Sequence, residues 1–361
     1  MKQKIRSFLA VAFSACLLSA CDKPNSSTEV PQSAVEKNNV SINRPLNVVA
    51  PWEITSVDPS KSGYIFQRLQ LAETLIDADD KGNLLPALAT SWQSNDSADE
   101  WILTLRENVK FHDGTILNAD NVVQSLTVAL AKPGPLKSIL IKKITALSPT
   151  QVQISLEKPL VSLPAYLAHA TTIILAKSAF DAENNVIAIV GTGAYKADKI
   201  EPPQKIEQTA FVDYWGEKAK ISQVTYLANS RSETRTLLAQ SNPNYLVFNL
   251  DPASLAKLKQ DPNLILSSKS IARTIQYKVN AKHPLFENIE VRQALSDAID
   301  RAGIAQSVLR IEKGIAEQIV PEAFSDWRVH AEYKQPDSVA IKARLIALGF
   351  VEDTQGMLHK D

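Results

Sequence analysis

The chain has 361 residues, of which 45% are hydrophobic, so it is long enough to form more than one lobe around a sizeable core. Its 39 basic and 39 acidic residues leave a formal net charge of zero, and no block of basic residues occurs. This balance argues against nucleic acid as a partner.

The first twenty residues have the pattern of a bacterial secretory signal. Lys2, Lys4 and Arg6 precede an apolar stretch of about a dozen residues, too short to span a bilayer. The stretch ends in "LSAC", where small residues precede Cys21 as at a lipoprotein cleavage site. We therefore expect residues 1–20 to be a lipoprotein signal peptide and Cys21 to be the lipidated first residue of the mature chain. An ordinary secretory signal followed by an accidental cysteine is the alternative.

A polar segment separates this signal from the body of the chain. Residues 21–45 are poor in aromatic residues, which predicts a flexible tether between the lipid and a folded domain. Asp22 resembles an inner-membrane retention signal, so we expect a lipid-anchored protein on the periplasmic side of the cell envelope. Cys16 leaves with the signal and Cys21 carries lipid, so the mature chain is predicted to have no disulfide. No later segment contains about 18 consecutive apolar residues, and no further membrane span is predicted.

Strand and helix patterns alternate after the tether. "PLNVVAP" is a short apolar run that predicts an opening strand. In "SGYIFQRLQLAETLIDADDKG", Leu69, Ala72, Leu75 and Ile76 recur at helical spacing and predict a helix. Apolar residues alternate in "WILTLR" and "QVQISL", as in half-buried strands.

Helical patterns become frequent in the rest of the chain. "NADNVVQSLTVALAK" predicts a helix that is capped by Asn118 or Asp120. "PDSVAIKARLIALGF" predicts another, which begins after Asp337 and ends at Gly349. "EVRQALSDAIDRAGIAQSVL" predicts one continuous helix, with an apolar face formed by Val291, Leu295, Ala298 and Ala302. The coarse class is mixed α/β with more than one lobe.

The triplet His112-Asp113-Gly114 admits two interpretations. Asp-Gly is a strong turn signal, because glycine adopts positive φ without steric cost and aspartate hydrogen-bonds the turn backbone. A hydrolase would need His112 to be oriented by a carboxylate, and adjacent residues on a tight turn point apart. No serine-centred elbow and no His-x-x-x-His spacing occurs in the sequence. We therefore predict a structural turn and no enzyme.

Five segments occur in a characteristic order. They are "LPALATSW", "WILTLRENVKFHDGTILNADNVVQSL", "VGTGAYKA", "DYWGEKAKISQVTYL" and "FENIEVRQALSDAIDRAGI". Together they resemble the family 5 extracellular solute-binding proteins, the peptide- and nickel-type receptors of ABC importers. The resemblance extends from about residue 46 to about residue 350.

The resemblance implies a periplasmic binding protein type II-like α/β fold with two large lobes and a smaller N-terminal lobe. Lobe I would comprise residues 46–68 and 190–270, lobe II residues 69–189, and lobe III would begin at residue 271. Members of the family continue far past the "KARLIALGF" helix. We therefore expect residues 271–361 to form a partial lobe III, in a chain that is truncated relative to the family.

The resemblance also implies a function. The protein would act as a monomer without a cofactor, capture peptides or a related small solute outside the inner membrane, and deliver it to an ABC permease. A nickel-chelate receptor of the same family is the alternative, with the metal held inside a small organic chelator rather than in a cage of protein side chains. A non-functional truncated remnant and a periplasmic hydrolase are further alternatives.

Six residues are candidates for contact with the solute, and no catalytic or metal-ligating residue is predicted. By the resemblance they lie beside the cleft, and they are Trp52, Tyr64, Phe66, Arg68, His169 and Arg273. A guanidinium can bind a ligand carboxylate through two parallel hydrogen bonds, which suits Arg68 and Arg273. A neutral imidazole at His169 could bind a metal chelate or accept a hydrogen bond from a peptide.

Overall fold

The computed structural model describes residues 44–360 except 269, 270, 272, 312, 313, 322, 323, 325, 326, 330 and 331. These residues belong to one of the two compact units into which the chain divides, residues 41–361. The predicted signal peptide, most of the tether and the lipidation site Cys21 lie outside the described residues. In the described part of the chain, none of the helices has the length and apolar character needed to cross a membrane.

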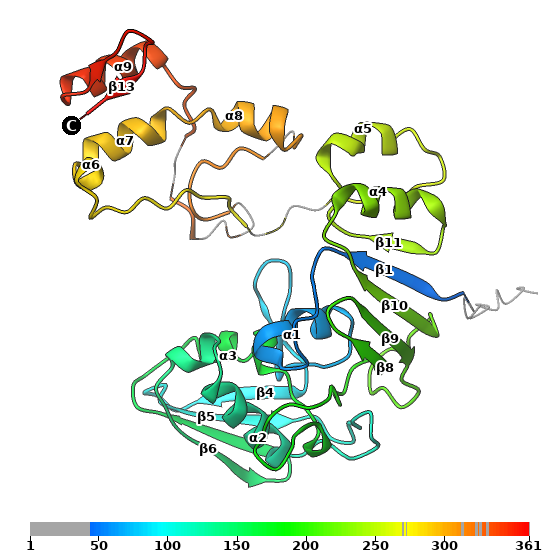
Figure 1. The fold of residues 1–361 in the computed structure, drawn as a ribbon. Coiled ribbons are helices and arrows are strands. Elements are labelled where there is room, and N and C mark those ends of the chain that lie inside the picture. Colours follow the sequence, from blue (N-terminus) through cyan, green and yellow to red (C-terminus); the bar gives the residue numbers. More distant parts are fainter. Residues whose placement is uncertain are drawn as a thin grey trace, which may run out of the picture. The chain divides into compact units, whose positions relative to one another are not determined.

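A five-stranded sheet joins segments that are far apart in the sequence (Figure 1). In pairing order its strands are β11 (Tyr245–Val247), β1 (Leu46–Ala50), β10 (Gln223–Ala228), β9 (Lys205–Ala210) and β8 (Tyr195–Glu201). The predicted opening strand is β1, which pairs in parallel with both β10 and β11. The carboxyl ends of these three strands therefore lie along the same edge of the sheet.

Helix α1 (Pro59–Arg68) follows the first strand and is shorter than predicted. Its N-cap is Asp58, which accepts a hydrogen bond from the backbone N–H of Ser60 at 2.9 Å. The prediction of a helix through Leu69 to Ile76 is wrong, because Gln70 has a φ of 55° and the chain then runs on as an extended segment.

The apolar spacing after α1 has a different cause from the one predicted. Leu71 is buried in the core beside the five-stranded sheet, whereas Leu75 is buried in a second core. One extended segment therefore contributes apolar residues to two cores, and their spacing in the sequence resembles the apolar face of a helix.

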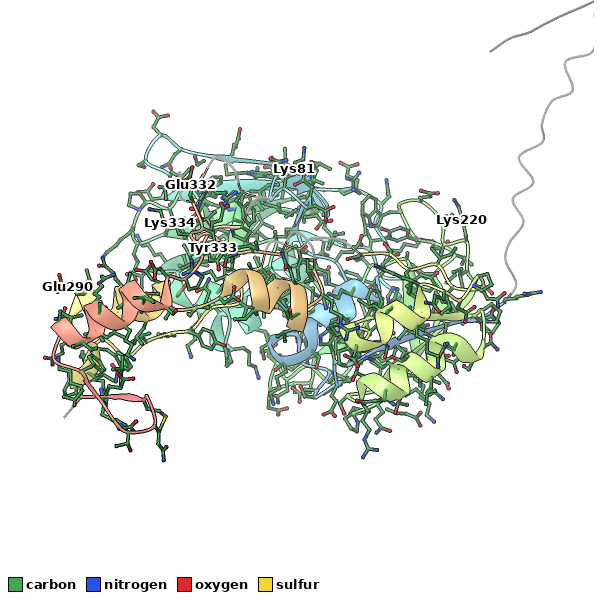
Figure 2. The ribbon with its side chains drawn as sticks, turned by 90° about the horizontal axis from the view of Figure 1, so that it is seen from above. Lys81, Lys220, Glu290, Glu332, Tyr333 and Lys334 are labelled. Atoms are coloured by element: carbon green, nitrogen blue, oxygen red, sulfur yellow. The ribbon has the colours of Figure 1, made fainter. Side chains whose placement is uncertain are left out.

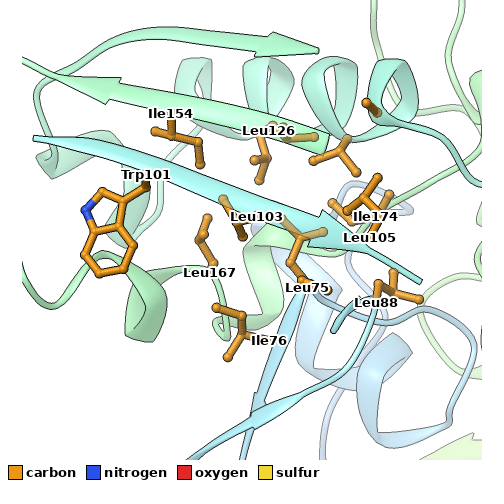
Figure 3. Packing of buried hydrophobic residues seen from close by; sticks show 14 of the residues in the cluster. Leu75, Ile76, Leu88, Trp101, Leu103, Leu105, Leu126, Ile154, Leu167 and Ile174 are labelled. Atoms are coloured by element: carbon orange, nitrogen blue, oxygen red, sulfur yellow. The ribbon is translucent and has the colours of Figure 1, made fainter. Parts of the chain in front are cut away.

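The second core lies against a four-stranded antiparallel sheet (Figure 3). In pairing order its strands are β4 (Ala89–Ser94), β5 (Glu100–Leu105), β7 (Gln151–Leu156) and β6 (Ile141–Ser148). The alternation predicted for β5 and β7 is confirmed, since every second residue of each strand is buried. Helix α2 (Ala119–Ala131) packs against β6 and β7, and its cap is Asn118 rather than Asp120.

Short elements connect and extend the two sheets. They are the hairpin β2 (Ile76–Ala78) and β3 (Leu84–Pro86), helix α3 (Leu163–Tyr166), and the 3-10 turns η1 (Pro135–Ser138), η2 (Ala170–Thr172) and η3 (Lys177–Ala179). Helix α4 (Ser232–Ser241) lies between β10 and β11 in the sequence, and η4 (Pro252–Ser254) and α5 (Leu255–Leu258) follow β11.

The C-terminal elements form a small core of their own. They are α6 (Pro284–Glu287), α7 (Ile289–Asp297), α8 (Arg301–Gly303), the π-turn η5 (Ile304–Val308), α9 (Ser338–Ala347) and the hairpin β12 (Val351–Glu352) and β13 (Leu358–His359). Val291, Ala294, Leu345 and Phe350 are its buried residues. The prediction for α9 is confirmed, including its cap at Asp337.

The single helix predicted over residues 290–309 is wrong. The chain breaks after α7, and Asp300 accepts a hydrogen bond from the Gly303 backbone N–H at 2.8 Å, which caps a new helix. The buried face of α7 contains Ala294, whereas Leu295 is exposed. The predicted division of the chain into lobes remains a prediction.

Candidate functional site

The carboxyl edge of the parallel strands carries two aromatic side chains. Trp52 follows β1 and Phe248 follows β11, and their ring centroids are 6.0 Å apart. The backbone holds both, since Phe248 donates its N–H to Val49 O at 2.8 Å and the Tyr226 hydroxyl donates to Trp52 O at 2.6 Å. In open α/β sheets, ligands bind beyond the carboxyl ends of the strands, so this edge is the natural place for a solute.

Arg68 ends α1 beside this edge and lies over Trp52. Its guanidinium carbon is 4.4 Å from the centroid of the Trp52 ring and 5.8 Å from that of Tyr64. The residue is exposed, and among the described residues it forms no ion pair. Aromatic faces stabilise the cation without consuming its N–H donors, which therefore stay available for the oxygens of a ligand.

Tyr64 and His169 form a hydrogen-bonded pair next to Arg68. The Tyr64 hydroxyl oxygen is 2.8 Å from His169 Nε2, and the rings meet edge to face. The Thr171 backbone N–H donates to His169 Nδ1 at 3.2 Å, so the neutral ring carries its proton on Nε2 and donates it to Tyr64. Burial lowers the pKa of His169, which favours this neutral form. The Tyr64 hydroxyl, 53% of whose residue surface is exposed, then has its own proton free for a ligand acceptor.

The backbones of α1 and η2 approach each other closely at Gly63, and this contact fixes the positions of Tyr64 and His169. A Cβ added to Gly63 would lie 2.2 Å from Ala170 O, so only glycine lets α1 pack this tightly against η2. Gly63 precedes Tyr64 and Ala170 follows His169, so the approach sets the distance between the two polar side chains.

The six predicted contact residues divide into three groups. Trp52, Tyr64, Arg68 and His169 lie together, and we call them the Arg68 cluster. Phe66 is 0% exposed and belongs to the core on the opposite face of α1, so it is not part of the Arg68 cluster. Arg273 is exposed, and within the described residues no hydrogen bond, ion pair or ring contact joins it to the cluster.

Phe248 is the residue of this face that sequence reasoning missed. The available signal was its position directly after the apolar run of "NYLVFN". A residue at the carboxyl end of a strand is a candidate only once that strand is known to be parallel to its neighbours.

The predicted structural turn at His112-Asp113-Gly114 is present. Gly114 has a φ of 85°, and Asp113 accepts the Thr115 backbone N–H at 3.0 Å. His112 is 6% exposed and donates from Nε2 to Gly193 O at 3.0 Å, while its Nδ1 has no hydrogen-bond partner among the described residues. Burial lowers the pKa of His112. Asp113 bonds Ser178 and Thr115 rather than His112, so the two do not form a catalytic pair.

A cavity of about 600 Å³ lies where the chain passes between the two sheets. Gln67, Gln70, Glu73, Tyr214 and Lys220 contribute to its lining, and Lys220 is exposed at the surface (Figure 2).

Glu73 is a partly buried acid in the lining of this cavity. It accepts hydrogen bonds from the Thr192 hydroxyl at 2.7 Å, Trp215 Nε1 at 2.9 Å and the Tyr214 hydroxyl at 3.0 Å. Burial raises the pKa of Glu73 against the effect of these three donors. The network ties together the segment before β2, the segment before β8 and the loop after β9, so its role is to hold these parts of the fold in place.

The described residues contain no group of three His, Cys, Asp or Glu side chains that could hold a metal ion. What the Arg68 cluster offers instead is a guanidinium, a hydroxyl donor and aromatic faces. This set of groups suits the carboxylate of a small solute.

Comparisons with known proteins agree with a binding role. Residues 83–356 match the family model for bacterial extracellular solute-binding proteins, family 5. The glutathione-binding protein GsiB of Escherichia coli O6:K15:H31 is 28% identical over 64% of this chain and 47% of its own length. The nickel-binding protein NikA of Staphylococcus aureus is 28% identical over 83% of this chain and 57% of its own length. The chain thus spans about half the length of these curated relatives.

Solved structures share the fold. The oligopeptide-binding protein AppA of Bacillus subtilis, in complex with a nonapeptide, has a TM-score of 0.72 and 23% identity, covering 88% of this chain and 67% of AppA. NikA of Staphylococcus aureus, in complex with Ni(L-His)2, has a TM-score of 0.69 and 24% identity, covering 86% of this chain and 65% of NikA. The predicted α/β class is therefore confirmed.

Proposed function

Because the chain belongs to the family 5 bacterial extracellular solute-binding proteins, we propose that it is the solute-binding receptor of an ABC importer. The family and fold are those of transporter solute-binding proteins, which are not enzymes. The proposed solute is a peptide or a related small molecule with a carboxylate. It is captured outside the inner membrane and passed to a permease by a lipid-anchored monomer.

The single observation that carries this proposal is Arg68. It is an exposed cation on an aromatic support, without an acidic partner in the described part of the chain. A guanidinium in this state favours a planar anion such as a carboxylate. The Tyr64 hydroxyl supplies a second donor for the same group.

A nickel chelate is the second candidate, and His169 bears on how it would bind. His169 donates from Nε2 to Tyr64, and its Nδ1 accepts from Thr171. Neither nitrogen has a lone pair free for a metal ion in this arrangement. A nickel complex would therefore bind through the carboxylates of its chelator at Arg68, with the metal inside the organic ligand.

A thermal melt of the mature chain tests the proposal. It is followed by tryptophan fluorescence alone and with glutathione, with the tetrapeptide Ser-Thr-Ser-Ala, and with Ni²⁺ plus L-histidine. A solute that binds only the folded state stabilises it by about 2.7 kcal/mol at a hundredfold excess over its Kd, so the midpoint rises with concentration. A selective rise names the solute class. No cooperative transition, or no rise with any solute, would favour the non-functional remnant.

A further inference from the structure

Arg235 is a buried cation whose hydrogen bonds to the described residues all go to backbone carbonyls. It lies on α4, is 4% exposed, and within the described residues has no acidic partner. Its four hydrogen bonds run from Nη1 to Asn229 O at 2.8 Å and Ser230 O at 2.9 Å, from Nη2 to Asn249 O at 2.6 Å, and from Nε to Phe248 O at 3.2 Å. A buried cation is costly, so a side chain held this way fixes the groups that satisfy it.

The four carbonyls belong to the loops that leave the carboxyl ends of two strands. Asn229 and Ser230 follow β10, and Phe248 and Asn249 follow β11. Asn249 has a φ of 55°, in the left-handed region that asparagine adopts more readily than most residues other than glycine. Arg235 therefore holds the turn after β11 in a bent form, at the edge where the Arg68 cluster lies.

The bent turn points one side chain toward the cluster. Phe248 is 41% exposed, and its ring is tilted by 45° to that of Trp52, the same ring that supports Arg68. The two rings form an apolar wall beside the guanidinium. A wall of this kind fits the apolar part of a molecule whose carboxylate is bound by the cation.

We propose that Phe248 contacts the apolar group next to the solute carboxylate, and that Arg235 is the positioning residue that places Phe248. This inference rests on the proposed receptor function. The inference narrows the class of solute to molecules with an apolar or flat substituent next to their carboxylate. The C-terminal residue of a peptide and an amino-acid chelator are examples. Lysine cannot replace Arg235, because an ammonium has three donors and no planar fork to reach two loops.

A double-mutant cycle separates positioning from simple stability. We compare Arg235→Lys, Phe248→Ala and the double variant by titration calorimetry with glutathione, Ser-Thr-Ser-Ala and Ni²⁺ plus L-histidine. Arg231→Lys, an exposed change just before the same helix, is the matched control. Each single change is expected to weaken binding about tenfold, typical for an interface aromatic. Arg235→Lys should cost less than about twofold in the Phe248→Ala background, because its effect passes through that ring.

Two results would overturn the inference. If Arg235→Lys lowers the melting temperature but leaves the Kd of the folded protein unchanged, Arg235 is only scaffold. If the two changes weaken binding additively, Arg235 does not act through Phe248. Should Arg235→Lys fail to fold, Phe248→Ala provides the second variant, since this exposed side chain can be truncated without removing a carbonyl bonded by Arg235, and an unchanged Kd would overturn the contact with the solute.

A readout without solute distinguishes failure of this inference from failure of the receptor function. The Trp52 indole N–H resonance, assigned with Trp52→Phe, should move in Arg235→Lys and keep the Phe248→Ala position in the double variant. If no probe binds the unaltered protein, the receptor proposal fails. A Trp52 resonance that stays in place in Arg235→Lys would then independently overturn the positioning role.

Discussion

Single residues decide whether a side chain on α1 faces the Arg68 cluster or the core. Tyr64 and Phe66 are two positions apart on one helix, yet Tyr64 joins the Arg68 cluster and Phe66 is fully buried. The family resemblance identified the segment, but it could not give the rotation of the helix. Phe248 was missed because its place depends on the pairing of β11 with β1, which local sequence does not reveal.

Removal of the Tyr64 hydroxyl tests its role as a donor. Tyr64→Phe is expected to weaken solute binding about tenfold or more, because a hydrogen bond to a charged group is worth about 1.5–3 kcal/mol. Tyr214→Phe removes a hydroxyl that donates to Glu73 instead. It should cost about 1–3 kcal/mol of unfolding free energy and leave the Kd unchanged. Equal Kd values for the two variants in calorimetry would contradict the assignment.

His112 predicts a pH dependence of stability. Burial lowers its pKa in the folded state below the ordinary value of 6.5. Between the lowered pKa and 6.5 the unfolded chain binds more protons, so the free energy of unfolding rises with pH across that window. His112→Gln can still donate to Gly193 O but does not titrate. Urea unfolding between about pH 5 and pH 7 should therefore show a smaller rise for this variant, and parallel curves would refute the prediction.

The elements show where periodicity is informative and where it misleads. Strands β5 and β7 and helices α2 and α9 each border one core, and their sequence patterns predicted them correctly. The segment after α1 crosses between two cores, and residues 290–309 are broken by the cap at Asp300. A periodic pattern predicts an element reliably only when one partner surface buries its whole length.

The packing of α1 on η2 depends on the missing side chain of Gly63. Gly63→Ala would place a methyl group 2.2 Å from Ala170 O, so the helix must move. We expect a loss of about 1–3 kcal/mol of unfolding free energy, together with weaker solute binding as Tyr64 leaves His169. Lys61→Ala, an exposed change on the same helix, should stay within about 0.5 kcal/mol in urea unfolding. An unchanged Kd in Gly63→Ala would show that the packing does not position the pair.

At the scale of the whole molecule, the pairing of strands that are far apart in the sequence cannot be predicted from local patterns and was accessible only through the family resemblance. Strand β1 pairs Leu46 with Val224, and no local pattern predicts this register. The ordered motifs implied the type II-like α/β fold, and the solved relatives confirm that class. The lobe boundaries remain predictions, as do the lipid anchor, whose site lies outside the described residues, and the permease, which is a separate protein.

The central claim is that Arg68, supported by Trp52, binds the carboxylate of the solute. The most direct measurement is calorimetric titration of Arg68→Met and Arg106→Met with the solute that stabilises the unaltered protein. Arg106 is the matched control, because its guanidinium carbon lies 4.2 Å from the Trp215 ring centroid, away from the cluster. We predict that Arg68→Met weakens binding about tenfold or more, and that Arg106→Met leaves the Kd within about twofold. Equal Kd values for Arg68→Met and the unaltered protein would contradict the claim.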